Sequence, residues 1–121
     1  MKLPFRIKIC GVTRPQDAVF AVSAGADAIG LNFYPKSPRW VSPDRVPDIV
    51  APIPAGVRRV GVFVNAAPDE ILRLVAFAKL DLVQLHGDER PDIVDSLGGI
   101  SLVRAFRCHA GQIDEVKAWL E

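Results

Sequence analysis

Two polar side chains interrupt the first apolar segment of the chain, and both could take part in chemistry. Lys8 and Cys10 stand two positions apart in residues 5–13, which read as a buried strand followed by a glycine turn. Alternate residues of a strand share a face, so the ammonium and the thiol are expected to lie together. A thiol acts as a base only as thiolate, and a nearby positive charge lowers its pKa. The pattern makes Cys10 a candidate for a reacting group and Lys8 a candidate for tuning its pKa. The alternative is a structural cysteine with a lysine paired to a carboxylate.

Three further side chains are candidates for a binding site. Arg39 lies in a proline-rich loop, residues 34–41, that follows the second apolar segment. A guanidinium there suits a carboxylate, because it offers two parallel hydrogen bonds. Gln84 and His86 alternate at the end of the fourth apolar segment and therefore share a face. The alternatives are a solvated loop arginine and a structural histidine.

Strand-like and helix-like segments alternate five times along the chain. Strands are predicted at residues 5–10, 28–33, 59–64, 82–86 and 102–106, and helices at 15–24, from 42 onward, at 68–79, at 91–97 and from 112 onward. Pro47 should make the second helix short or irregular. Thr13 and Gln16 predict a capping box for the first helix. Nearly continuous apolar strands between amphipathic helices indicate a parallel α/β sheet.

Two architectures fit this order. One is the (βα)5 portion of a (βα)8 TIM barrel, with parallel strands and outer helices. The other is a complete doubly wound sheet of the flavodoxin or response-regulator kind. No linker divides the chain, so residues 1–121 are expected to form a single domain. The last helix has no C-cap, which favours a partial barrel truncated within the helix after strand five.

Composition excludes several classes of function. Fifteen basic and fourteen acidic residues give a net charge of +1, so no partner among nucleic acids or anionic membranes is expected. No apolar run is long enough for a membrane span or a signal peptide. Cys10 and Cys108 have neither metal-site nor disulfide spacing, and Cys108 and His109 are interpreted as incidental. The composition predicts a cytoplasmic protein with reduced thiols.

Five short motifs decide between the architectures. They are Lys-Ile-Cys-Gly-Val-Thr at 8–13, Gly-Ala-Asp-Ala-Ile-Gly at 25–30, Phe-Tyr-Pro-Lys-Ser-Pro-Arg at 33–39, Val-Gly-Val-Phe-Val-Asn at 60–65 and Gln-Leu-His-Gly at 84–87. In this order and spacing the chain resembles the phosphoribosylanthranilate isomerase family of tryptophan biosynthesis. The resemblance implies the first five-eighths of a TIM barrel.

The family's reaction is an Amadori rearrangement of a small phosphorylated substrate, N-(5-phosphoribosyl)anthranilate, with neither metal nor organic cofactor. The resemblance implies that Cys10 is the base, that Arg39 binds the anthranilate carboxylate, and that Gln84 and His86 line the substrate pocket. The family's acid, an aspartate ending strand six, and its phosphate loops after strands seven and eight have no counterpart in residues 1–121.

The 121-residue chain alone is therefore expected to be inactive. It should self-associate, pair with a complementing C-terminal barrel segment, or remain loosely packed. The side chains of Lys8, Ile29, Val62, Gln84 and Phe106 are expected to face inward, and Arg104 is expected to join Lys8 and Gln84 in a polar layer. The alternative is a half-barrel without catalytic function.

Overall fold

A computed structural model describes residues 4–107, 111 and 113–120 of the 121-residue chain. Five strands form one parallel sheet: β1 (Lys8–Ile9), β2 (Ala28–Asn32), β3 (Arg58–Phe63), β4 (Leu82–Leu85) and β5 (Leu102–Arg104). The helices are α1 (Pro15–Ser23), the 3₁₀ helix η1 (Pro43–Arg45), α2 (Val46–Val50), α3 (Pro68–Ala78), α4 (Ile93–Ser96) and α5 (Ile113–Leu120). The predicted alternation of strands and helices is confirmed.

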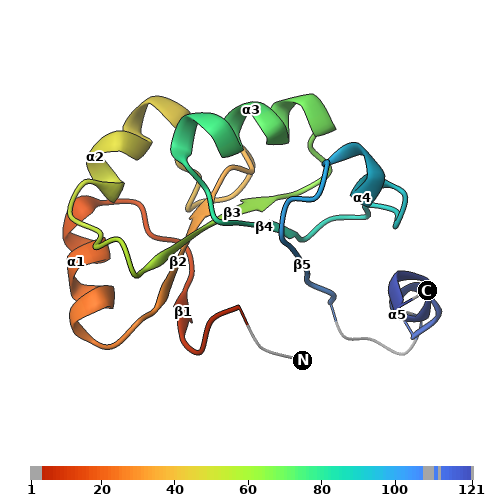
Figure 1. Cartoon of the computed structure of the whole chain (residues 1–121), viewed down its shortest axis with the longest axis horizontal. Helices are drawn as coiled ribbons and strands as arrows, with labels where there is room; N and C mark the ends of the chain where they lie inside the picture. Colours follow the sequence, from red (N-terminus) through yellow and green to blue (C-terminus); the bar gives the residue numbers. More distant parts are fainter. Residues whose placement is uncertain (1–3, 108–110, 112, 121) are drawn as a thin grey trace.

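The strand order decides the architecture. The sheet runs β1-β2-β3-β4-β5, so each strand pairs with the next one along the chain. A doubly wound sheet of the flavodoxin kind has the order 2-1-3-4-5, because its first crossover reverses direction. The sequential order is that of a TIM barrel, and the (βα)5 prediction is confirmed. Figure 1 shows the helices placed in an arc outside the strands.

The two faces of the sheet are packed differently. The helix-facing side carries the main core, which buries Leu31 of β2, Phe63 of β3 and Leu85 of β4 beneath α1, α2 and α3. On the opposite face, Ala28, Val60 and Leu82 form a second, smaller cluster. This two-sided burial explains why the strands read as apolar at nearly every position.

A contact across the second face shows that the sheet curves. The Lys8 ammonium of β1 donates a hydrogen bond to the Gln84 side-chain oxygen of β4. In a flat sheet these strands, three spacings apart, would be separated by roughly 14 Å. The contact therefore requires a concave face, which is the inner face of a barrel.

Two details of the predicted elements are wrong. The Thr13–Gln16 capping box does not form: Arg14 is the N-cap residue of α1, makes no side-chain cap bond, and pairs instead with Asp17. Strand β1 is also shorter than predicted. The Asp27 carboxylate accepts the backbone N–H groups of Ile7 and Arg6, which removes them from a strand ladder.

The predicted irregularity near Pro47 is confirmed, because the segment divides into η1 and the five-residue helix α2. The predicted start of the last helix at Gln112 lies outside the described residues. No helix in the described part of the chain is long and apolar enough to cross a bilayer.

Candidate active site

Cys10 lies in the turn that leaves β1. Its side chain is half-buried, and the next residue, Gly11, has a φ of 79°. The backbone N–H of Gly11 donates to the Gly30 carbonyl of β2 at 3.1 Å. Gly30 also leaves room for the thiol, since a Cβ there would lie 2.9 Å from Cys10 Sγ. Two glycines thus fix the turn and hold Sγ at the carboxyl end of the sheet, where α/β barrels place reacting groups.

Arg39 lies over the same turn. A Cβ built on Gly11 would stand 2.5 Å from Arg39 Cδ and 2.6 Å from its Nη1, so the side chain occupies the space above this glycine. The loop is shaped by Ser37, whose hydroxyl accepts the Arg39 N–H at 3.1 Å and the Asn32 side-chain N–H at 3.3 Å. The structure thus brings a guanidinium beside the thiol-bearing turn, from a position 29 residues further along the chain.

Lys8 and Gln84 form a polar pair on the concave face. Gln84 is buried, and its side-chain oxygen accepts the hydrogen bond from the Lys8 ammonium. The Lys8 Nζ also lies 6.0 Å from the centre of the Phe5 ring. An ammonium on a partly buried face needs such partners, because an unpaired charge there is costly. In the described residues this lysine is paired with an amide rather than with a carboxylate.

His86 lines a cavity of about 220 Å³ at the carboxyl ends of β3, β4 and β5. The cavity is bounded by Tyr34, Val64, Asn65, His86, Gly87, Asp88, Ala105 and Arg107. Cys10 and Arg39 are not among these residues. The predicted site residues therefore form three groups: Cys10 with Arg39 at the rim, Lys8 with Gln84 on the concave face, and His86 with its cavity.

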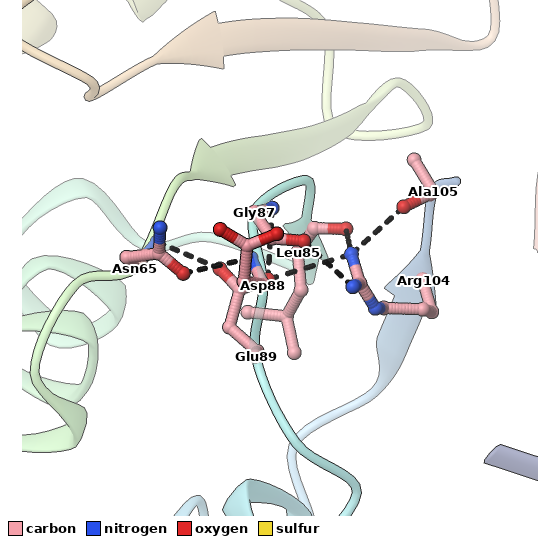
Figure 2. A network of polar contacts seen from close by, with 7 residues as sticks. All are labelled: Asn65, Leu85, Gly87, Asp88, Glu89, Arg104 and Ala105. Atoms are coloured by element: carbon pink, nitrogen blue, oxygen red, sulfur yellow. Dashed lines mark hydrogen bonds and ion pairs between the residues drawn. The ribbon is translucent and has the colours of Figure 1, made fainter. Parts of the chain in front are cut away.

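A buried polar network, shown in Figure 2, lies beside this cavity and was not predicted. The Glu89 carboxylate accepts the backbone N–H groups of Asn65 and Gly87, both at 2.8 Å. Arg104 Nη1 lies 3.4 Å from Glu89 Oε1, and the two side chains are 9% and 2% exposed, arginine first. Arg104 also donates to the carbonyls of Leu85, Gly87 and Ala105 at 3.1, 2.7 and 2.8 Å.

The expected direction of two side chains is wrong. Arg104 pairs in register with Leu85, whose side chain faces the helices, so the Arg104 side chain faces the helices too. The Arg104 guanidinium lies 5.3 Å from the Trp119 ring of α5. Ile29 also packs into the core on the helix side. Neither belongs to the polar layer of Lys8 and Gln84. In β5 it is Val103 that pairs with Gln84 and faces inward.

Glu89 was missed because it lies outside any predicted strand. The one signal for it is an acidic residue shortly after the glycine that ends β4. Across residues 4–107, 111 and 113–120, no three His, Cys, Asp or Glu side chains gather closely enough to hold a metal ion. The arrangement offers a thiol, a guanidinium and an imidazole at the rim and an amide on the concave face, which suits proton transfer on an anionic substrate.

Comparison with known proteins agrees with this arrangement. The family model for N-(5'-phosphoribosyl)anthranilate (PRA) isomerase matches residues 7–119. The chain belongs to the phosphoribosylanthranilate isomerase family. A member from Rubrobacter xylanophilus is 44% identical over 119 residues, which are 96% of this chain and 58% of that protein.

Solved structures of the family share the fold. The isomerase of Thermotoga maritima superposes with a TM-score of 0.78 at 44% identity, covering 83% of this chain and 49% of that one. A second, solved in complex with reduced 1-(o-carboxyphenylamino)-1-deoxyribulose 5-phosphate, has a TM-score of 0.85 at 39% identity, covering 93% and 59%. The chain thus spans about half the length of these phosphoribosylanthranilate isomerases.

Proposed function

We propose that this chain supplies the Cys10 half of a phosphoribosylanthranilate isomerase active site. The reaction is the Amadori rearrangement of N-(5-phosphoribosyl)anthranilate to 1-(2-carboxyphenylamino)-1-deoxyribulose 5-phosphate, a step of tryptophan biosynthesis that takes place in the cytoplasm. The observation that carries the proposal is the position of Arg39 against Gly11, directly beside Cys10, in a member of this family.

Each residue has a proposed role. Cys10, as thiolate, removes the proton from C2 of the ring-opened substrate, and the adjacent Gly30 leaves room for the thiol itself. Arg39 binds the anthranilate carboxylate with two charge-assisted hydrogen bonds. Lys8 contributes positive charge on the Cys10 face and is oriented by Gln84. His86 lines the adjoining cavity and orients substrate. The relative with a bound phosphorylated product analogue supports a ligand of this class.

The acid that opens the furanose ring is proposed to come from a sixth strand, on a segment that completes the barrel. The sheet edge at β1 is suited to receive such a segment, or a second copy of the chain. Ile7 and Ile9 are 50% and 42% exposed there, and Phe20 of α1 is 68% exposed. Apolar groups along an unpaired edge favour pairing with another strand. One solved relative is described as monomers of the dimeric isomerase of Thermotoga maritima, which is compatible with self-association.

The binding part of the proposal is tested by titrating the chain with reduced 1-(o-carboxyphenylamino)-1-deoxyribulose 5-phosphate. Arg39→Lys should weaken binding about tenfold, because an ammonium cannot supply the planar fork. Lys36→Arg, an exchange at an exposed position of the same loop, is the control and should leave binding unchanged. Equal affinity in Arg39→Lys and the unaltered chain would return Arg39 to the role of a solvated loop residue. A chain that neither binds the analogue nor gains turnover with a complementing segment would be the non-catalytic half-barrel.

A further inference from the structure

The Arg104 guanidinium holds the backbone on both sides of His86. Nη1 donates to the Leu85 carbonyl at 3.1 Å and Nη2 to the Gly87 carbonyl at 2.7 Å. The backbone N–H of His86 donates to the Phe63 carbonyl at 2.9 Å. Three hydrogen bonds thus fix the peptide groups around one residue. The side chain of Arg104 on β5 thus joins the backbone on either side of His86 to the neighbouring strand.

The Glu89 carboxylate extends this bracing to the loop after β3. Its two oxygens accept the N–H groups of Gly87 and Asn65, and the Asn65 side-chain oxygen in turn accepts the Asp88 N–H at 2.8 Å. Asn65 has a φ of 53°, a left-handed conformation that needs local support. Figure 2 shows that these groups come from the ends of three neighbouring strands.

The stability of the fold does not account for this pair. A buried ion pair contributes little compared with apolar side chains of the same volume, because both charges lose their hydration. Aromatic rings cover the guanidinium, with Phe106 at 4.6 Å and Trp119 at 5.3 Å from Arg104. What an apolar pair could not provide is the set of directed hydrogen bonds to the loops that line the His86 cavity.

We propose that Glu89 and Arg104 are positioning residues that fix His86 and Asn65 at the cavity. The identity of the ligand in that cavity rests on the proposed function, but the positioning itself does not. The pair touches backbone rather than substrate, so its removal should displace His86 while leaving the remainder of the sheet folded.

The experiment uses residues 1–121 with uniform isotope labelling, so that backbone amides and histidine rings are both read by NMR without ligand. Glu89→Gln keeps the size of the side chain but leaves one acceptor oxygen for the N–H groups of Asn65 and Gly87, so one of these groups loses its acceptor. Arg104→Lys keeps the charge but loses the fork. Both variants should shift the His86 ring signals, and Glu89→Gln should also speed amide exchange at Asn65 or Gly87 about tenfold, as for one lost hydrogen bond. The two histidines of the chain are told apart with His109→Gln.

Matched controls are Glu70→Gln and Arg73→Lys, the same exchanges at exposed positions of α3. They should leave the His86 signals unchanged. Unshifted His86 signals in a folded Glu89→Gln variant would overturn the proposal, as would failure of both Glu89→Gln and Arg104→Lys to fold, since the pair would then serve folding alone.

A titration with the reduced product analogue separates this proposal from the proposed function. If the unaltered chain binds, Glu89→Gln should bind about tenfold more weakly and Glu70→Gln equally well. If the unaltered chain does not bind, the binding part of the proposed function fails, and the ligand-free spectra still decide whether the pair positions His86.

Discussion

Gly11→Ala is the substitution that most directly links the fold to the site. Gly11 has a φ of 79°, where an alanine costs about 1–2 kcal/mol because its Cβ crowds the following carbonyl. Alanine also lowers the conformational entropy of the unfolded chain, which stabilises the folded state by about 0.4–1 kcal/mol. The net destabilisation should be about 1 kcal/mol.

A second effect of the new methyl group falls on Arg39. The Cβ would lie 2.5 Å from Arg39 Cδ and 2.8 Å from Nε, so the side chain must move. These atoms belong to the far end of an exposed, flexible side chain, and their displacement should add no more than about 0.5 kcal/mol. Binding should suffer more, because a charge-assisted pair with a carboxylate contributes about 1.5–3 kcal/mol. We expect roughly ten- to hundredfold weaker binding of the reduced product analogue.

Gly98→Ala is the matched control. Gly98 has a φ of 63°, and a Cβ there would meet no atom within 4 Å. Urea denaturation should therefore give similar losses for the two variants, whereas only Gly11→Ala should lose affinity. A loss of stability several kcal/mol larger for Gly11→Ala than for Gly98→Ala would show that Arg39 cannot move aside. Unchanged affinity of Gly11→Ala for the reduced product analogue would refute the position assigned to the Arg39 guanidinium.

Three further predictions concern other parts of the chain. Gly87→Ala should destabilise the fold by about 1–3 kcal/mol in thermal or urea unfolding, because its Cβ would lie 2.9 Å from the backbone nitrogen of Asn65, which cannot move aside. A smaller loss would contradict the close approach of these two loops. Backbone hydrogen bonds from Ile7 and Arg6 lower the pKa of Asp27 in the folded state. The contribution of Asp27 to stability is therefore fully present above the unfolded pKa of about 3.9, and it is lost as the pH falls through the lower folded pKa. Asp27→Asn should accordingly lower stability at pH 7 and flatten the acid side of the stability profile, and an unchanged profile would count against these bonds. Lys8→Met should slow alkylation of Cys10 at neutral pH, measured with iodoacetamide; an equal rate would remove Lys8 from the proposed chemistry.

The elements and their order followed from local patterns, but the faces of β5 did not. The apolar stripe of α3, with Ile71, Leu74 and Ala78 buried, was readable from the sequence. The direction of Arg104 was not, because a shift of one residue in register reverses every side chain of a strand. Only the pairing of Leu85 with Arg104 places that side chain toward the helices.

The site residues could be predicted from the sequence where they lie in short motifs, but not where their contacts span several loops. Cys10 and Arg39 end up at one turn, as expected of two loops on the same rim. Glu89 was missed since two of its partners are backbone groups of Asn65 and Gly87, which leave no trace in residue types, and the third, Arg104, was expected to face the other side of the sheet. The capping box failed because Arg14, rather than Thr13, is the N-cap residue.

The most direct test of the central claim is turnover by residues 1–121 mixed with a segment carrying strands six to eight of the Rubrobacter xylanophilus relative. The isomerisation is followed by the loss of N-(5-phosphoribosyl)anthranilate. We predict little turnover by the chain alone, measurable turnover in the mixture, and a loss of at least about a hundredfold when Cys10→Ser replaces the thiolate base with a weakly basic hydroxyl. Equal turnover with Cys10→Ser would contradict the assignment of the base, and full turnover by the chain alone would show that the acid lies within residues 1–121.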